Sequence, residues 1–214
     1  MGKKEFRVIG ENLPRKEGVG KVTGAALYAD DLRFPGCLYG GTIRSRVPRG
    51  RVKSIRFRDG IPWKEFVGVP PQDIPGENLV TLIDKSQPFL GEDVMHIAEP
   101  VALLAHRDQQ LVQKALGFVD VEIEAAPAVF TIDEALAKRD VYKQYQIRRG
   151  DVSASWPTAD VVLEETYRTG SQEQLYIEPQ GIIARASKSG ITIWGSMQCP
   201  FYIQRALVPL FGMP

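Results

Sequence analysis

The sequence is poor in the residues on which small disulfide-stapled and zinc-bound proteins depend. It contains 2 cysteines and 2 histidines in 214 residues. Cys37 and Cys199 lie far apart and form no Cys-x-x-Cys motif, so we expect two free thiols in a reducing compartment. His96 and His106 have no cysteine or second histidine at ligand spacing, which argues against a structural zinc site.

Long apolar runs and an excess of charge of one sign are also missing. No stretch approaches the ~18–20 consecutive apolar residues of a membrane helix, and no apolar signal core follows the charged start of the chain. We therefore expect a cytoplasmic protein with no membrane partner. The 27 Lys and Arg against 26 Asp and Glu give a net charge of +1, which disfavours a globally basic nucleic-acid binder. Walker, Gly-x-Gly-x-x-Gly and Gly-x-Ser-x-Gly motifs are absent from the sequence.

What is present is the pattern of a mixed α and β chain. Residues 1–19 are polar and rich in Gly, Lys and Glu, which is typical of a leading arm. Beyond them, strands are predicted at 38–43, 52–57 and 100–105. The last of these is a continuous apolar run, which favours a buried strand.

Two helices and a further strand follow. Asp108 suits the N-cap of a helix. The apolar face of that helix is expected to carry Leu111, Val112, Ala115 and Leu116. Residues 119–124 alternate between apolar and acidic side chains, which predicts a half-buried strand with a carboxylate face. A capping box at residues 131–134 predicts a short helix that ends near residue 138.

The second part of the chain begins after a polar segment, 139–149, which we expect to be a linker. Strands are predicted at 161–169, 181–186 and 191–194, and the last two form a hairpin. Because a two-stranded hairpin is marginal alone, we expect further strands from a continuation of the chain or from a partner chain.

A helix is predicted from Pro200, which suits its first position, to Phe211. Its apolar face would be formed by Ile203, Leu207, Leu210 and Phe211. Pro209 is expected to end or kink this helix near Val208.

Several segments together resemble the molybdenum-binding subunit of the xanthine dehydrogenase/aldehyde oxidase family. Their order and spacing match the family collinearly over about residues 13–214, although each motif is short. Residues 98–105 match a strand motif in which Ala98-Glu99 stands where Gly-Asp or Gly-Glu is usual. The other matching segments are residues 21–31 with 35–39, 121–129, 150–152 with 159–164, 172–179 and 194–198.

The resemblance implies an α+β fold with two units. An α/β hammerhead domain is expected at 20–138. After the linker, residues 150–214 are expected to form the incomplete start of a mixed α/β molybdopterin-binding domain.

The resemblance also implies a molybdenum hydroxylase, which oxidises a heteroaromatic or aldehyde C–H bond with oxygen from water. The complete enzyme is expected to hold molybdenum on molybdopterin, in the cytosine dinucleotide form. Its partners would be a small-molecule substrate, the rest of the molybdenum subunit, and iron–sulfur and FAD subunits or domains that carry [2Fe–2S] clusters and FAD.

Gln198 is the one candidate cofactor-binding residue that the resemblance assigns to this chain. It matches a family glutamine that approaches the molybdenum ligands, and its amide can both donate and accept hydrogen bonds. The alternative is an exposed polar residue between a strand and a helix. The step at Cys199-Pro200 could open a helix whose N-terminal amides face an anionic cofactor, or Pro200 could be a routine first helical residue.

Two carboxylates in the second unit could be interpreted as a catalytic acid/base pair, but their spacing argues against it. Glu173 and Glu178 are five residues apart, so on a strand their side chains would point to opposite faces. The resemblance gives this segment a structural place beneath the cofactor instead. We therefore assign no catalytic residue and no metal ligand to this chain.

Two elements of the resembled family are missing from the sequence: a Gly-Gly-x-Phe-Gly-Gly loop and the catalytic glutamate that acts as general base. We therefore expect a fragment of a longer polypeptide, or one piece of a split subunit. We expect this piece alone to bind no cofactor and to be inactive.

A basic segment at 44–58 supports a competing interpretation. Its cations are Arg44, Arg46, Arg49, Arg51, Lys53, Arg56 and Arg58. Such a cluster could bind nucleic acid, but only Phe57 is available for stacking. The acidic strand at 119–124 could neutralise it within the fold or across an interface. A third possibility is a non-catalytic interaction or assembly module built on the hammerhead domain.

Overall fold

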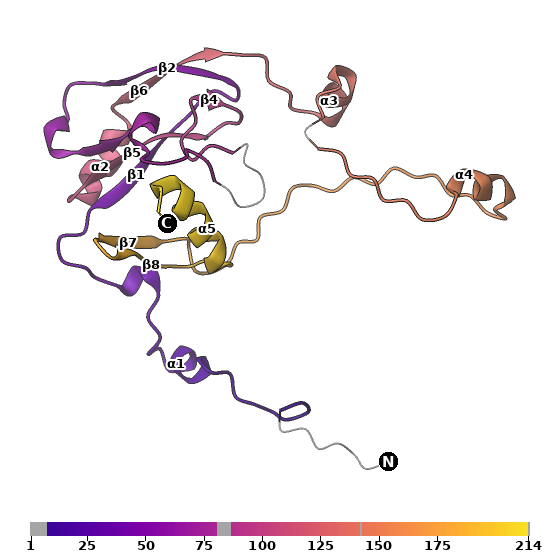
Figure 1. Ribbon diagram of the computed structural model, residues 1–214, viewed down its shortest axis with the longest axis horizontal. Helices are drawn as coiled ribbons and strands as arrows, with labels where there is room; N and C mark the ends of the chain where they lie inside the picture. Colours follow the sequence, from indigo (N-terminus) through magenta and orange to yellow (C-terminus); the bar gives the residue numbers. More distant parts are fainter. Residues whose placement is uncertain (1–7, 81–86, 142, 214) are drawn as a thin grey trace.

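A computed structural model describes residues 8–80, 87–141 and 143–213 (Figure 1). The first seven residues of the expected arm lie outside the described residues. The rest of the arm runs away from the sheets in an exposed path, and a short helix, α1 (Gly18–Val22), begins at its end. Among the described residues, no helix has the length and apolar character needed to cross a membrane.

Two three-stranded antiparallel sheets form the body of the first unit. The first sheet has the order β1-β5-β3, with β1 (Tyr39–Arg44), β5 (Pro100–His106) and β3 (Val67–Val69). The second has the order β4-β2-β6, with β4 (Asp93–Val94), β2 (Gly50–Phe57) and β6 (Val119–Ala125). The predicted strands at 52–57 and 100–105 are confirmed, and the one at 38–43 is shifted by one residue.

The core lies where the apolar faces of the sheets meet helix α2 (Gln109–Leu116). Val101 and Val112 are fully buried, and Leu104 is 2% exposed. Gly41 on β1 allows the close approach of α2, because a Cβ atom there would lie 2.7 Å from Cγ1 of Val112. The continuous apolar run of β5 is thus explained by burial between α2 and the second sheet.

The local signals read from the sequence in this unit are confirmed. The Asp108 carboxylate accepts hydrogen bonds from the N–H groups of Gln110 and Leu111, at 2.8 and 3.1 Å, and so caps α2. Thr131 and Glu134 form the predicted capping box of α3 (Ile132–Lys138). The acidic residues of β6 point outward and its Val119 is buried.

A strained turn precedes β5. Ala98 has φ of 65°, in the left-handed region that favours glycine. Its N–H donates to the Ser45 carbonyl, and the N–H of Ser45 donates to the Glu99 carbonyl, both at 2.9 Å. The Glu99 carboxylate is buried and accepts from the N–H of Met95 at 2.5 Å. These bonds fix the turn although Ala98 is strained, which explains why glycine is usual at this position of the resembled motif.

Replacing Ala98 with glycine should therefore stabilise the protein. The strain of a left-handed alanine costs roughly 1–3 kcal/mol, and the added freedom of glycine in the unfolded chain offsets about 0.4–1 kcal/mol of the relief. We expect Ala98→Gly to raise the free energy of unfolding by about 1 kcal/mol, measured by urea denaturation. A lower urea midpoint for the variant would contradict the strained turn.

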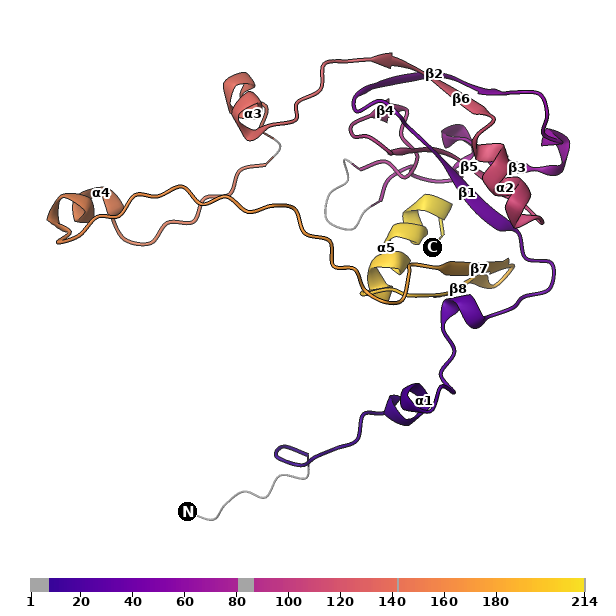
Figure 2. The ribbon, with the colours of Figure 1, turned by 180° about the vertical axis from the view of Figure 1, so that it is seen from behind.

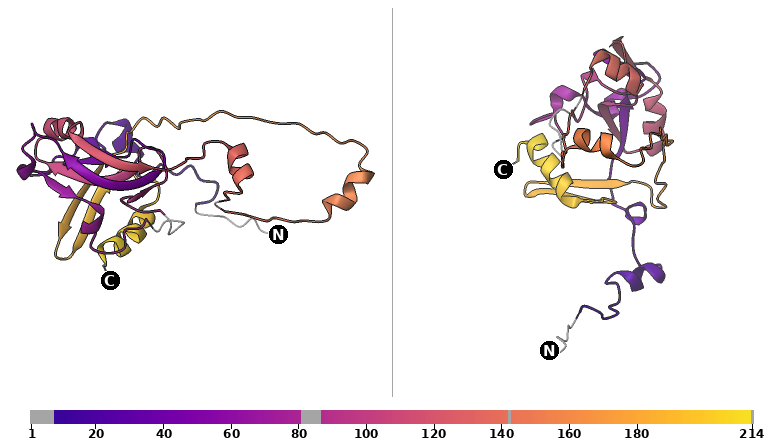
Figure 3. Two further views of the ribbon diagram at one scale, coloured as in Figure 1. Left: turned by 90° about the horizontal axis from the view of Figure 1, so that it is seen from above. Right: turned by 90° about the vertical axis from the view of Figure 1, so that its right-hand side faces the viewer.

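The second part of the chain leaves the sheets on a long exposed segment. Residues 143–170 carry α4 (Val152–Ser155) and extend far from both sheets, as Figure 3 shows from above. The strand predicted at 161–169 is wrong. Leu163 is 90% exposed and Tyr167 is 87% exposed, because no strand within the described residues lies beside this segment to complete its hydrogen bonds.

The chain then returns to the sheets as a hairpin and a helix. The predicted hairpin is confirmed, with β7 (Ile182–Ser187) paired to β8 (Gly190–Gly195). Helix α5 (Pro200–Phe211) lies between this hairpin and the first unit in both Figure 1 and Figure 2. The predicted helix over Pro200–Phe211 is confirmed. Of the two effects expected of Pro209, an end of the helix near Val208 is wrong, because α5 continues to Phe211 and Gly212 adopts a left-handed cap.

Candidate functional site

Gln198 lies in the turn that joins β8 to α5. Its side chain is exposed, so its amide is accessible to a bound group. Cys199 is the N-cap of α5, and its thiol makes no capping hydrogen bond. We define residues 196–199 as the Gln198 turn.

Ser196 adds a feature that the sequence did not single out. Its hydroxyl oxygen is buried and has no hydrogen-bond partner among the described residues. A buried hydroxyl without a partner costs free energy, so such groups mark places where a partner is to be bound. The serine stands two residues before Gln198 in the same matched segment, but its burial could be found only in the structure.

The start of α5 completes this turn. Its first position is Pro200, which lacks an N–H, and no side chain caps the following amides. The N-terminal end of a helix carries partial positive charge and donors that suit an anion. An exposed amide, a buried hydroxyl and an uncapped helix start thus gather at one turn, and together they fit a polar, anionic group.

The two carboxylates considered as an acid/base pair, Glu173 and Glu178, lie in a segment without regular secondary structure. Residues 172–179 contain no strand in the structure. The Glu173 carboxylate accepts a hydrogen bond from the N–H of the next residue at 3.2 Å, and Glu178 lines a separate cleft beside the hairpin. The argument from opposite faces of a strand therefore does not apply to this segment.

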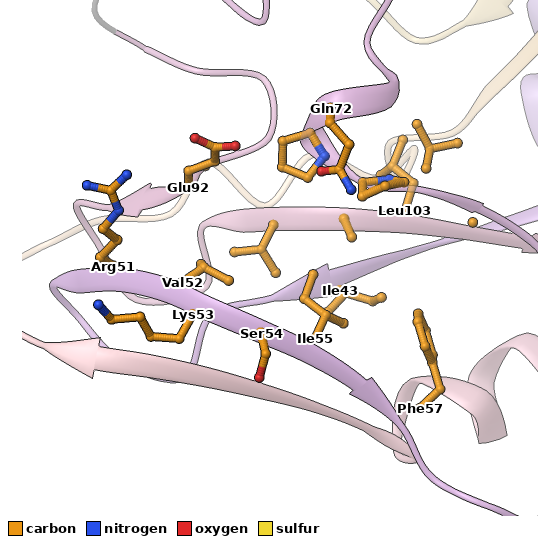
Figure 4. A pocket seen from close by; sticks show the side chains of 17 residues that line it. Ile43, Arg51, Val52, Lys53, Ser54, Ile55, Phe57, Gln72, Glu92 and Leu103 are labelled. Carbon is orange, nitrogen blue, oxygen red and sulfur yellow. The ribbon is translucent and has the colours of Figure 1, made fainter.

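A cavity of about 520 Å³ lies elsewhere, between β2 and β5 (Figure 4). Its base is apolar, with Ile43 and Ile55 pointing toward Leu103, and Arg51 and Glu92 stand at one end. None of the residues that line it belongs to the Gln198 turn. The cavity and the polar turn are therefore two separate places on the molecule.

Four of the seven cations of the basic segment at 44–58 pair with carboxylates of the neighbouring strands. Its ion pairs are Lys53–Glu124, Arg58–Asp120 at 3.4 Å, Arg56–Glu122 at 3.8 Å and Arg51–Asp93 at 4.0 Å. Two further arginines donate to backbone carbonyls, Arg44 to Ala98 and Arg49 to Pro127. The acidic strand thus lies beside the basic segment within the fold, and its carboxylates pair with three of the seven cations.

Removing one of these cations should change the titration of its partner. The hydrogen bond from Lys53 lowers the pKa of Glu124 below its ordinary value, with the Lys53 charge adding to the effect. Lys53→Met should therefore raise the pKa of Glu124 toward that ordinary value, observed by NMR titration of its carboxyl carbon. Stability from this pair is present above the ordinary pKa and is lost as pH falls through the lowered one.

The matched control for that titration is Lys64→Met, which removes another exposed lysine. It should leave the pKa of Glu124 unchanged. An unchanged pKa in Lys53→Met would show that the pair does not exist in solution.

The sequence matches two protein-family models. Residues 23–127 match the model for the "Aldehyde oxidase and xanthine dehydrogenase, a/b hammerhead domain", and residues 134–214 match the model for a "Molybdopterin cofactor-binding domain". The Gln198 turn lies inside the second match.

Curated proteins with similar sequences belong to the same group of enzymes. The chain is 31% identical to the nicotinate dehydrogenase large molybdopterin subunit of Eubacterium barkeri, over 100% of this chain and 53% of that protein. It is 29% identical to a probable xanthine dehydrogenase subunit of Bacillus subtilis, over 94% of this chain and 28% of that protein. The chain thus spans about half the length of the first relative and less of the second.

Among solved structures, the aldehyde oxidoreductase from Desulfovibrio desulfuricans matches with a TM-score of 0.81 and 22% identity. The match covers 97% of this chain and 26% of that one. At this identity the likeness concerns the fold.

Proposed function

We propose that this chain is a part of the molybdenum-binding subunit of a molybdenum hydroxylase. The chain belongs to the aldehyde oxidase and xanthine dehydrogenase family, and its hammerhead match is followed by a molybdopterin cofactor-binding match. The observation that carries the proposal is the Gln198 turn. There a buried hydroxyl without a partner and an uncapped helix start lie inside the cofactor-binding match.

The residues of this turn fit the group that the family binds. Ser196 and Gln198 would hold its polar atoms, and the N-terminal end of α5, where the N–H of Tyr202 donates to the Cys199 carbonyl, would face its negative charge. Bound in the complete enzyme, the molybdenum–molybdopterin group supplies the oxidation of a substrate C–H bond. The role of this chain is to bind and orient that group. We propose the cytosine dinucleotide form, and [2Fe–2S] clusters and FAD on partner subunits.

The substrate class that we propose is a heteroaromatic ring or an aldehyde. The names of two relatives, nicotinate dehydrogenase and xanthine dehydrogenase, support the heteroaromatic alternative. The general base and the glycine-rich loop expected for the reaction are not in this sequence. We therefore propose that this chain alone does not turn over.

We also propose a division into a hammerhead domain at 20–138 and a cofactor-binding part at 150–214. The location that we propose is the cytoplasm, which the two free thiols of Cys37 and Cys199 support. A non-catalytic assembly module is the alternative. Molybdenum analysis of the chain co-expressed with its partners separates the two, because only the enzyme would carry the metal.

Gln198→Ala should lower turnover of the complete enzyme by about 10–100-fold, the range typical for groups that support a metal centre. Gln204→Ala removes the same amide from an exposed position on α5 and should leave turnover unchanged. Steady-state kinetics per bound molybdenum is the measurement.

Equal kinetics in the two glutamine variants would overturn the assignment of Gln198. A complete complex that purifies without molybdenum in its wild-type form would instead overturn the proposed function.

A further inference from the structure

The C-terminal end of α5 is capped by a loop from the first unit. The N–H of Gly76 donates to the Leu210 carbonyl at 3.0 Å, and the N–H of Glu77 donates to the Pro209 carbonyl at 2.9 Å. These carbonyls belong to the last turn of the helix, where carbonyls lack intrahelical partners; the Pro209 carbonyl also accepts from the N–H of Gly212 in the helix cap, at 3.2 Å. A segment more than 130 positions earlier in the sequence thus completes the hydrogen bonds of α5.

The contact depends on the small size of Gly76. A Cβ atom at this position would lie 2.1 Å from the Pro209 carbonyl oxygen and 2.8 Å from the Gly212 nitrogen. Both are backbone atoms, so a side chain at position 76 could be accommodated only if the helix end moved away. Gly76 does not have a positive φ, so this requirement concerns space and not backbone conformation.

The capping loop is itself tied to the core. The Asn78 side chain donates to the Leu90 carbonyl at 2.7 Å and accepts from the Leu90 N–H at 2.9 Å. Leu90 is fully buried. On the other side of the contact, Leu210 is 6% exposed and is the one buried residue of α5. An unbroken series of bonds therefore connects buried Leu90 to the end of α5.

The opposite end of the same helix carries the Gln198 turn. Twelve residues separate the two ends, which corresponds to about 18 Å of helix. A helix of this length moves as a rigid body, so a shift at its C-terminal end displaces its N-terminal end as well.

We infer that the loop at Gly76–Asn78 is a positioning element for the cofactor-facing turn. It fixes α5 from its C-terminal end and so sets the place of Gln198 relative to the hammerhead sheets. Gly76 is a positioning residue, because it acts through α5 and touches no reacting group. This role rests on the proposed function, whereas the capping contact does not.

The first test reports on the turn without any cofactor. In a Cys37→Ser background, Cys199 is the single thiol and lies beside Gln198. Gly76→Ala should raise the rate at which an aromatic disulfide reagent labels Cys199 by about 30-fold, the ratio expected from two lost hydrogen bonds of about 1 kcal/mol each. Asn78→Ala should raise it in the same direction, because it releases the loop from Leu90.

Two matched controls accompany these variants. Gly170→Ala makes the same change where a Cβ atom would meet nothing within 4 Å, and Asn12→Ala removes an exposed asparagine. Both should leave the labelling rate unchanged. Hydrogen exchange of the β5 amides should be the same in all variants, which shows that the core has not unfolded. Unchanged labelling in Gly76→Ala with an intact core would overturn the inference.

The second test uses the complete enzyme. Gly76→Ala should change the Mo(V) electron paramagnetic resonance line shape per bound molybdenum, and Gly170→Ala should not. A lower metal content with an unchanged line shape would show a role in folding alone and would overturn positioning. If the wild-type complex holds no molybdenum, the proposed function fails, and the labelling result alone decides whether the loop positions the turn.

Discussion

The folded part of this molecule depends on the burial of β5. This strand is hydrogen-bonded to β1 on one side and to β3 on the other, and its Val101 is fully buried. It leads directly into α2, whose Val112 packs against Gly41 of β1. The second sheet closes over the same apolar side chains through Val94 and Val119. The loop that carries Asn78 is anchored to buried Leu90, so the placement of α5 also derives from this core.

Local sequence signals were sufficient where a segment's partners are close in the chain. The Asp108 cap, the Thr131 capping box and the alternation of β6 are set by neighbours within a few residues, and the structure has them as expected. Residues 161–169 were also predicted as a strand from their local sequence, but a local signal says nothing of a neighbouring strand to pair with. Pro209 did not end α5, because the helix continues to Phe211 and stops only at the left-handed Gly212.

In the candidate site, too, the residues with a local sequence signal could be predicted and the others could not. The resemblance of residues 194–198 was enough to single out Gln198, because a short motif carries it. The buried hydroxyl of Ser196 and the space requirement at Gly76 arise only when distant segments meet, and neither has a sequence signature. The basic segment is the reverse case. Its sequence alone is compatible with a nucleic-acid-binding surface, yet in the fold β6 supplies carboxylates opposite three of its cations.

The separation in sequence between the capping loop and α5 has a consequence for the order of folding during synthesis. All strands of both three-stranded sheets lie between Tyr39 and Ala125, so the ribosome can release a segment that completes them before α5 exists. Domains that emerge first fold first, and the amides of Gly76 and Glu77 then remain bonded to water while about ninety further residues are made. The strands of the two sheets can thus form a template on which α5 is seated later.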